Sequence, residues 1–184
     1  MAILLLLEDE PMHPYGIRQR IQAWDKDRTV NVTQPNAVYQ TVERLRRDEL
    51  IRLREVTRLD NRPDRTVYET TPAGTSLAHS WLTDLLAVPA AEFPAFPAAL
   101  AFVQSLPRGA VIAALEKRAD TLRFTLEQVR QEVATRTAEV PGGVDRIHLI
   151  EVEYLQAMWA AEIAWVTTLV DDLHHNRVWP VAES

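Results

Sequence analysis

The spacing of apolar residues predicts an amphipathic helix over Pro35–Glu49. Val38, Val42 and Leu45 fall within about 60° of one another when each residue turns the helix by about 100°. The opposite face is polar, with hydrogen-bonding side chains toward the start of the helix: Asn36, Gln40, Glu43, Arg44 and Arg47. A helix that reads base edges needs this arrangement, because its first turns enter the major groove.

A strand pair is expected directly after this helix. Residues 52–59 alternate basic and apolar side chains, and this period of two predicts a strand. Residues 60–64 contain asparagine, proline and aspartate, which favour a turn, and residues 65–70 return as a second strand. A helix, an apolar pair at Leu50 and Ile51, and then a basic hairpin is the order expected of a winged helix-turn-helix.

Further helices are expected on either side of this segment. Ile3–Leu7 predicts a short buried helix, and Tyr15–Trp24 places its apolar residues on one helical face. Thr71, followed by proline, is the expected N-cap of a helix that ends near Val88. Residues 89–97 contain three prolines and are expected to form a linker between two domains.

The C-terminal half predicts two long helices. Alternating spacings of three and four residues form an apolar seam: Ile112, Leu115, Ala119, Leu122, Leu126, Val129 and Val133. Pro141 and two glycines should end this helix, and Val144–Asn176 should form the second. The second helix carries two apolar stripes, so both sides need cover. Two helices alone cannot supply that cover, and a second subunit is therefore expected.

The charge distribution weakens the objection that an acidic chain cannot bind nucleic acid. The net charge is -6, but residues 1–75 hold 12 basic and 12 acidic residues. The acidic excess therefore lies in residues 76–184. Residues 34–65 contain 8 arginines and 6 acidic residues, a small positive balance where the winged segment lies.

Several classes of function have no support in the sequence. There is no cysteine, which excludes disulfides and thiolate zinc sites. We found no nucleophile motif, glycine-rich phosphate loop or set of three metal ligands, so neither an enzyme nor a cofactor nor a metal is expected. The only apolar run near the start is Ile3–Leu7, which is too short to cross a membrane, and a cytoplasmic protein without a membrane partner is expected.

A set of short motifs resembles the PadR family of bacterial transcriptional regulators. No single motif is strongly specific, but their order and spacing together are. They are His13, Pro14, Tyr15, Gly16 and Ile17, then Val38 and Tyr39 with Leu45, Leu50 and Ile51, and finally Arg62, Pro63, Tyr68, Thr71 and Gly74. The resemblance covers nearly the whole chain. It implies a winged-helix DNA-binding domain, a homodimer and repression relieved by a small molecule.

Two positions depart from the family pattern. Pro14 stands where the family usually has glycine after the histidine, and Glu49 stands where it has glycine before the apolar pair. Glycine there would supply a left-handed helix C-cap at little cost. Glu49 is therefore expected to need another turn geometry, and its negative charge would lie beside the wing.

These observations together predict a mostly α-helical chain in three parts. Residues 1–88 would form a winged helix-turn-helix DNA-binding domain with three to four helices and a two-stranded wing. Residues 89–97 would form the proline-rich linker. Residues 98–184 would form a dimerisation and effector domain with long antiparallel helices.

The expected DNA contacts come from three places. We expect groove contacts from Asn36, Ala37, Gln40 and Arg44, backbone contacts from Thr33 and Tyr39, and wing contacts from Arg62 and Arg65. The site would be a pseudo-palindromic stretch of double-stranded DNA. The polar helix face alone also fits ordinary solvated surface. The wing arginines could instead pair across the strands with Glu55, Asp60 and Asp64. The alternative function is a winged-helix protein–protein module with a helical dimerisation arm and no DNA site.

Two clusters in the C-terminal half have competing interpretations. Tyr154, Met158, Trp159 and Trp165 could line a pocket for an aromatic effector, but aromatic residues at helical spacing more often form dimer core. His174 and His175 lie beside two aspartates and could bind a metal in a metal-dependent enzyme. Polar surface at a helix C-terminus explains them better.

Overall fold

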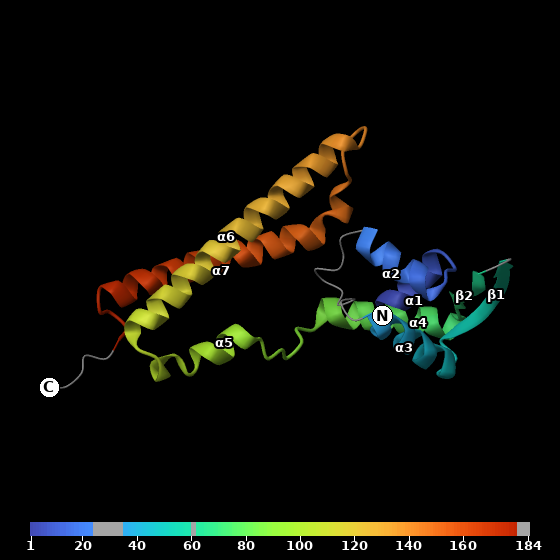
Figure 1. Cartoon of the computed structure of the whole chain (residues 1–184), viewed down its shortest axis with the longest axis horizontal. Coiled ribbons are helices and arrows are strands. Elements are labelled where there is room, and N and C mark those ends of the chain that lie inside the picture. Colours follow the sequence, from blue (N-terminus) through green and yellow to red (C-terminus); the bar gives the residue numbers. More distant parts are fainter. Residues whose placement is uncertain (24–34, 60–61, 180–184) are drawn as a thin grey trace. The chain divides into compact units, whose positions relative to one another are not determined.

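The chain folds into two compact units, Met1–Glu92 and Phe93–Ser184. The computed structural model describes residues 1–23, 35–59 and 62–179, with the backbone alone for residues 23, 35–36, 56–59 and 62–65. Figure 1 shows helices and a two-stranded hairpin in the first unit and helices in the second. The mostly helical fold class predicted from the sequence is confirmed.

Three helices form the core of the first unit with the base of the hairpin. They are α1 (Ala2–Asp9), α2 (Pro14–Ala23) and α3 (Pro35–Arg47). Their buried side chains meet in one cluster that includes Leu4, Ile17, Val38, Val42 and Leu45. The predicted apolar stripe of α3 is therefore the face that packs inward.

The start of α2 is fixed by a histidine cap. The backbone N–H of Gly16 donates to Nδ1 of His13 at 3.0 Å, so the imidazole takes the place of the usual serine or aspartate cap. A Cβ on Gly16 would lie 2.6 Å from that nitrogen, so a larger residue here would displace the imidazole. The predicted end of this helix at Trp24 lies outside the described residues.

The hairpin consists of β1 (Ile51–Leu59) and β2 (Arg62–Thr70), paired antiparallel. Its register slips between Leu53 and Glu55, where β1 has one extra residue, and again between Thr57 and Leu59, where β2 has the extra residue. The outer edge of β2 is bridged by Met12, which exchanges two backbone hydrogen bonds of 3.1 Å with Tyr68. Burial raises the pKa of the Tyr68 phenol, so this core residue stays neutral.

Helix α4 (Pro72–Ala87) closes the first unit. As predicted, Thr71 caps it: the Gly74 N–H donates to Thr71 Oγ1 at 3.1 Å, and proline follows the cap. The first half of α4 packs on α1 through Ala78, and His79 pairs with Glu8 at 2.9 Å. Its second half is apolar and exposed, with Leu85 and Leu86 among the most exposed.

The second unit begins with a short helix inside the predicted linker. Helix α5 (Ala95–Leu100) starts after Pro94 and contains Pro97 in its first turn. Proline is tolerated there because the first N–H groups of a helix have no intrahelical partner. A 3₁₀ turn, η2 (Val103–Ser105), connects α5 to the long helices.

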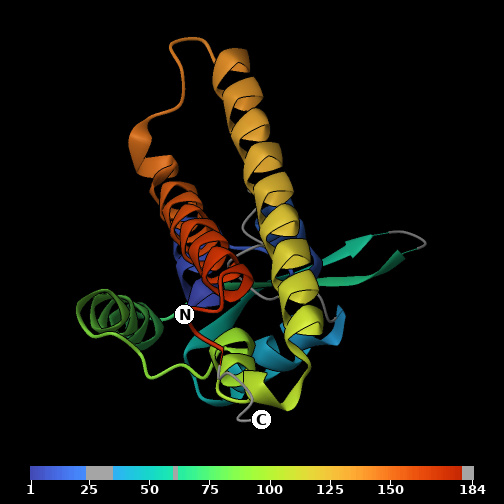
Figure 2. The same cartoon turned by 90° about the vertical axis from the view of Figure 1, so that its left-hand side faces the viewer.

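Helices α6 (Arg108–Glu139) and α7 (Ile150–His174) form an antiparallel hairpin. Figures 1 and 2 show that they pack at the end where α6 begins and diverge toward their connection. Val111, Leu115, Val166 and Leu173 are buried at the packed end.

The prediction of one helix from Val144 to Asn176 was wrong at its start. Residues 144–149 contain the 3₁₀ turn η3 (Arg146–His148), and α7 begins only at Ile150. His148 and Leu149 donate to carbonyls three residues earlier, which closes tighter turns than an α-helix.

Candidate nucleic-acid interface

The outer face of α3 is polar and open to solvent. Tyr39 is 50% exposed, Gln40 and Arg44 are exposed, and Ala37 is half-buried, whereas Val38 between them is buried. The exposed side chains border a shallow groove together with Glu43, Arg46 and Arg47. The face that the sequence assigned to DNA is therefore available to a partner.

Two of the three arginines in the last turns of α3 have acidic partners on the same segment. Arg46 pairs with Glu43 at 3.1 Å, and Arg47 pairs with Asp48 at 3.2 Å. Arg44 lies near the start of α1: burial and the charge of Arg44 lower the pKa of the Met1 α-amino group. This end of α3 carries less effective charge than its arginine content suggests.

Helix α3 ends in a Schellman motif. The Leu50 N–H donates to Leu45 O at 2.9 Å, and the Glu49 N–H donates to Arg46 O at 3.1 Å. Glu49 itself has a φ of 57°, the left-handed conformation that favours glycine. The expectation that Glu49 would adopt another turn geometry is wrong. It adopts the glycine geometry and bears the strain.

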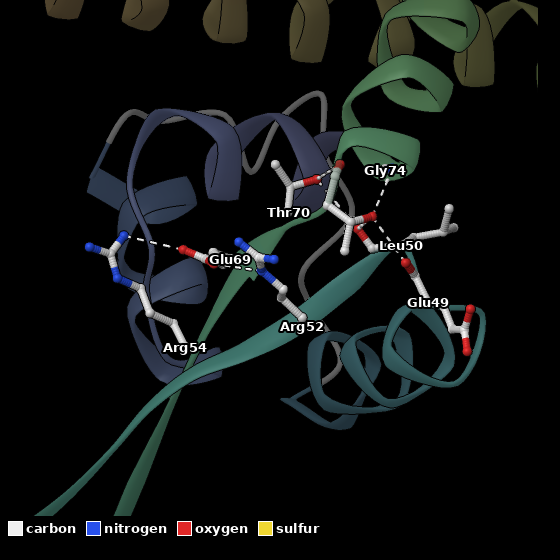
Figure 3. A network of polar contacts seen from close by, with 8 residues as sticks. Glu49, Leu50, Arg52, Arg54, Glu69, Thr70 and Gly74 are labelled. Atoms are coloured by element: carbon white, nitrogen blue, oxygen red, sulfur yellow. Dashed lines mark hydrogen bonds and ion pairs between the residues drawn. The ribbon is translucent and has the colours of Figure 1, made fainter.

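The carbonyl groups of this turn lie against the start of α4. Thr71 Oγ1 lies 3.0 Å from Glu49 O and 3.2 Å from Leu50 O, and the Thr71 N–H donates to Leu50 O at 3.0 Å. Figure 3 shows Glu49, Leu50 and Gly74 gathered at this junction. A Cβ on Gly74 would lie 2.0 Å from Leu50 O, so the close approach requires glycine.

The base of the wing carries an ion-pair cluster that sequence reasoning missed. Glu69 accepts from Arg52 Nε at 2.7 Å and from Arg54 Nη1 at 3.3 Å, and it lies between them in Figure 3. Glu69 stands directly opposite Arg52 in the ladder, which is the signal that a register prediction could have used. The predicted partners Asp60 and Asp64 lie outside the described side chains, so their pairing with the wing arginines stays a prediction.

Several predicted DNA contacts lie outside the described residues. These are Thr33 and the side chains of Asn36, Arg62 and Arg65. Strand β2 begins at Arg62, three residues before the predicted start at Arg65. Ala37, Tyr39, Gln40 and Arg44 lie together on α3 and remain the predicted groove and backbone contacts.

The sequence from residue 3 to residue 80 matches the family model of the PadR-like transcriptional regulators. This sequence match to the PadR-like family lies within the N-terminal unit. The resemblance inferred from the motif order is thereby confirmed. No curated protein sequence matches the chain.

Solved PadR structures share the fold over nearly the whole chain. Bacillus subtilis PadR in complex with operator DNA is 17% identical with a TM-score of 0.74, covering 94% of this chain and 95% of that one. The same protein in complex with p-coumaric acid is 16% identical with a TM-score of 0.74, covering 94% and 96%. A PadR-like transcriptional regulator from Bacillus cereus is 14% identical with a TM-score of 0.59, covering 93% and 92%.

Beyond the PadR-like unit, α7 presents an exposed apolar face. Ile150, Tyr154, Met158 and Trp165 are 51%, 63%, 51% and 49% exposed, and they fall within about 80° of one another at 100° per residue. Trp159 is half-buried and lies at least about 100° away, on the stripe that contains buried Val166. The four residues predicted as one cluster are therefore divided between two faces.

An aromatic anchor joins α5 to the two long helices. Arg118 Cζ lies 3.6 Å from the centre of the Phe96 ring, and Trp165 meets that ring edge-on at 6.3 Å. Glu162 holds the same arginine at 2.5 Å. No motif in the sequence signalled this contact, because it joins residues that are far apart in the chain.

The histidines near the end of α7 have acidic neighbours. His174 Nε2 lies 3.4 Å from Glu116, and His175 Nδ1 lies 3.2 Å from Asp171. Hydrogen bonding from Arg177 lowers the pKa of Asp171. Within the described ranges, no group of three or more histidine or acidic residues could hold a metal ion, and no helix could cross a membrane.

Proposed function

We propose that this chain is a sequence-specific DNA-binding transcriptional regulator whose recognition element is α3. The observation that supports it is the open polar face of α3 within a PadR-like unit. Gln40 and Arg44 lie one helical turn apart and can hydrogen-bond to base edges, and exposed Tyr39 lies beside them. The complex of Bacillus subtilis PadR with operator DNA supports the same use of the fold.

The proposed regulator acts as a homodimer. The exposed apolar face of α7 needs cover in water, and a second copy of the chain supplies an identical face across a two-fold axis. Two copies of α3 would then enter successive major grooves of a pseudo-palindromic site. We propose that the dimer represses transcription from the promoter to which it binds.

The proposed repression ends when a small molecule binds, and an aromatic compound is the first candidate. The complex of Bacillus subtilis PadR with p-coumaric acid supports this choice. In this chain, Tyr154 and Trp165 offer exposed aromatic surface, and the exposed thioether of Met158 lies on the same helix face. Such an effector can act only if it binds the DNA-competent and released states with different affinities.

The decisive experiment is a fluorescence anisotropy titration with DNA from upstream of the gene that encodes this chain. The double variant Gln40→Ala with Arg44→Ala should lose specific binding, because it removes two base-reading groups. Each such contact contributes about 1–3 kcal/mol of discrimination. The matched control, Gln128→Ala with Arg130→Ala, removes the same chemistry from exposed positions of α6. Unchanged affinity and preference in the α3 variant would contradict the assignment.

The pairing of Arg46 and Arg47 with acidic neighbours favours a second candidate, a protein-binding module without a DNA site. Salt distinguishes the two functions. DNA affinity should fall steeply between about 50 and 200 mM salt through counterion release. A protein interface should respond much less over the same range.

A further inference from the structure

One hydroxyl group joins the end of α3 to the start of α4, the last helix of the first unit. Thr71 Oγ1 accepts from the Gly74 N–H at 3.1 Å and so caps α4. The same oxygen lies within hydrogen-bond distance of Glu49 O and Leu50 O, where its single proton is shared. The residue that caps α4 is therefore also the donor to the carbonyl groups at the end of α3.

The other contacts of α3 leave its orientation to these hydrogen bonds. The apolar stripe of α3 fixes its distance from the core, but an apolar contact is not directional. Directional contacts come from hydrogen bonds at the junction, where Leu50 O also accepts the Thr71 N–H at 3.0 Å. Gly74 allows the backbones to approach closely enough for these bonds to form.

We propose that Thr71 is a positioning residue for DNA binding, and that it couples the orientation of α3 to that of α4. The inference rests on the proposed function, since α3 is taken as the recognition helix. Helix α4 leads from the winged unit to residues 88–94 and then to α5. A displacement of the start of α4 therefore reaches α3 through the Thr71 hydroxyl and the carbonyls of Glu49 and Leu50.

Three substitutions separate the two roles of the hydroxyl. Thr71→Ser keeps both the acceptor and the donor. Thr71→Asp keeps an acceptor for the Gly74 N–H but, when ionised, has no proton to donate to the carbonyls of Glu49 and Leu50. Thr71→Val removes both functions with little change in shape. Ser76→Asp adds the same negative charge at an exposed position one turn along α4, and so controls for electrostatic repulsion of DNA.

Two readouts are needed in the full-length protein. Amide hydrogen exchange of Gly74 reports the cap of α4, and exchange of Leu50 reports the end of α3. We expect Gly74 to stay protected in Thr71→Ser and Thr71→Asp, and to exchange on the order of tenfold faster in Thr71→Val. Leu50 should exchange faster in both Thr71→Asp and Thr71→Val.

DNA affinity decides whether the bond positions α3. Using the upstream DNA as probe, we expect Thr71→Ser to match the wild type. Thr71→Asp should bind on the order of tenfold more weakly than Ser76→Asp, the loss expected for one hydrogen bond to the carbonyls. Equal affinities of Thr71→Asp and Ser76→Asp would overturn the inference, and so would unchanged exchange at Leu50.

Loss of stability must be separated from loss of position. Glu49→Gly relieves the left-handed strain, and in the Thr71→Asp background it should restore the folded population without restoring a donor. Weak DNA binding in this double variant supports positioning, whereas full recovery means that Thr71 acts only through stability. If the wild type itself does not bind the DNA, the proposed function fails, while exchange at Leu50 still tests the junction.

Discussion

At the scale of single residues, Glu49 shows how a strained conformation can persist beside the proposed DNA-binding face of α3. Its φ of 57° costs a side chain with a Cβ on the order of 1 kcal/mol. The Schellman hydrogen bonds at the end of α3 and the hydrogen bond from Thr71, the cap of α4, maintain this left-handed conformation. The turn therefore owes its shape to the surrounding contacts and not to the preference of the residue.

Replacing Glu49 by glycine should stabilise the winged unit by about 1 kcal/mol, because glycine adopts this φ without steric cost. The measurement is the free energy of opening of the buried amides of α3, obtained from native-state hydrogen exchange. Asp48→Gly serves as the control, since φ at Asp48 is not positive and glycine should destabilise there. A Glu49→Gly protein no more stable than the wild type would show that the turn is unstrained.

At the scale of elements, α5 owes its attachment to few contacts. None of its six described residues is fully buried, and its main anchor is the Phe96 ring beneath Arg118 and beside Trp165. A cation–π contact at a partly exposed site contributes about 0.5–1 kcal/mol. Phe96 therefore links α5 to both long helices, since Arg118 lies on α6 and Trp165 on α7.

Phe96→Ala should release α5 while leaving the α6–α7 hairpin folded. We expect backbone amides of residues 95–100 to lose protection from hydrogen exchange, and tryptophan emission to shift to the red as Trp165 becomes more exposed. Phe93→Ala is the matched control, because Phe93 is 95% exposed just before the helix. Equal exchange in the two variants would mean that Phe96 does not anchor α5.

Elements set by local pattern could be predicted, and those set by distant contacts could not. The stripe of Val38, Val42 and Leu45 gave α3 its inward face, and the threonine–proline signal placed the start of α4 within one residue. Residues 95–97 were assigned to a linker because prolines usually break helices, although proline is compatible with the first turn.

In the candidate site, too, residues set by local pattern could be predicted and residues set by distant contacts could not. The polar face of α3 follows from periodicity alone, so Gln40 and Arg44 could be selected from the sequence. Glu69 could not, because its role depends on the exact register that brings it opposite Arg52. The donor role of Thr71 required the turn of Glu49, which the sequence argued against.

At the scale of the whole molecule, the apolar face of α7 determines the expected assembly. The hairpin of α6 and α7 opens toward its connection, and the first turns of α7 expose Ile150, Tyr154 and Met158. Covering these side chains with a second subunit would stabilise the assembly, because apolar area removed from water contributes about 25 cal/mol per Å².

Tyr154→Glu combined with Met158→Glu should convert the proposed dimer into a monomer, because it places two charges in an apolar interface. Sedimentation velocity measures the mass directly. The control is Ala160→Glu combined with Thr167→Glu, which adds the same charges at exposed positions on another side of α7. A wild-type chain that sediments as a monomer would contradict the homodimer, as would a dimer that survives in the Tyr154/Met158 variant.

The two register slips of the hairpin and the Met12 bridge also affect how this protein should behave when concentrated. A two-stranded hairpin has two open edges, and open edges invite strand-by-strand association between molecules. Here Met12 occupies the outer edge of β2 at Tyr68, and the two register slips interrupt the regular ladder of β1. Neighbouring molecules are therefore denied a continuous strand to extend, and the wing can remain exposed without seeding fibrous aggregates.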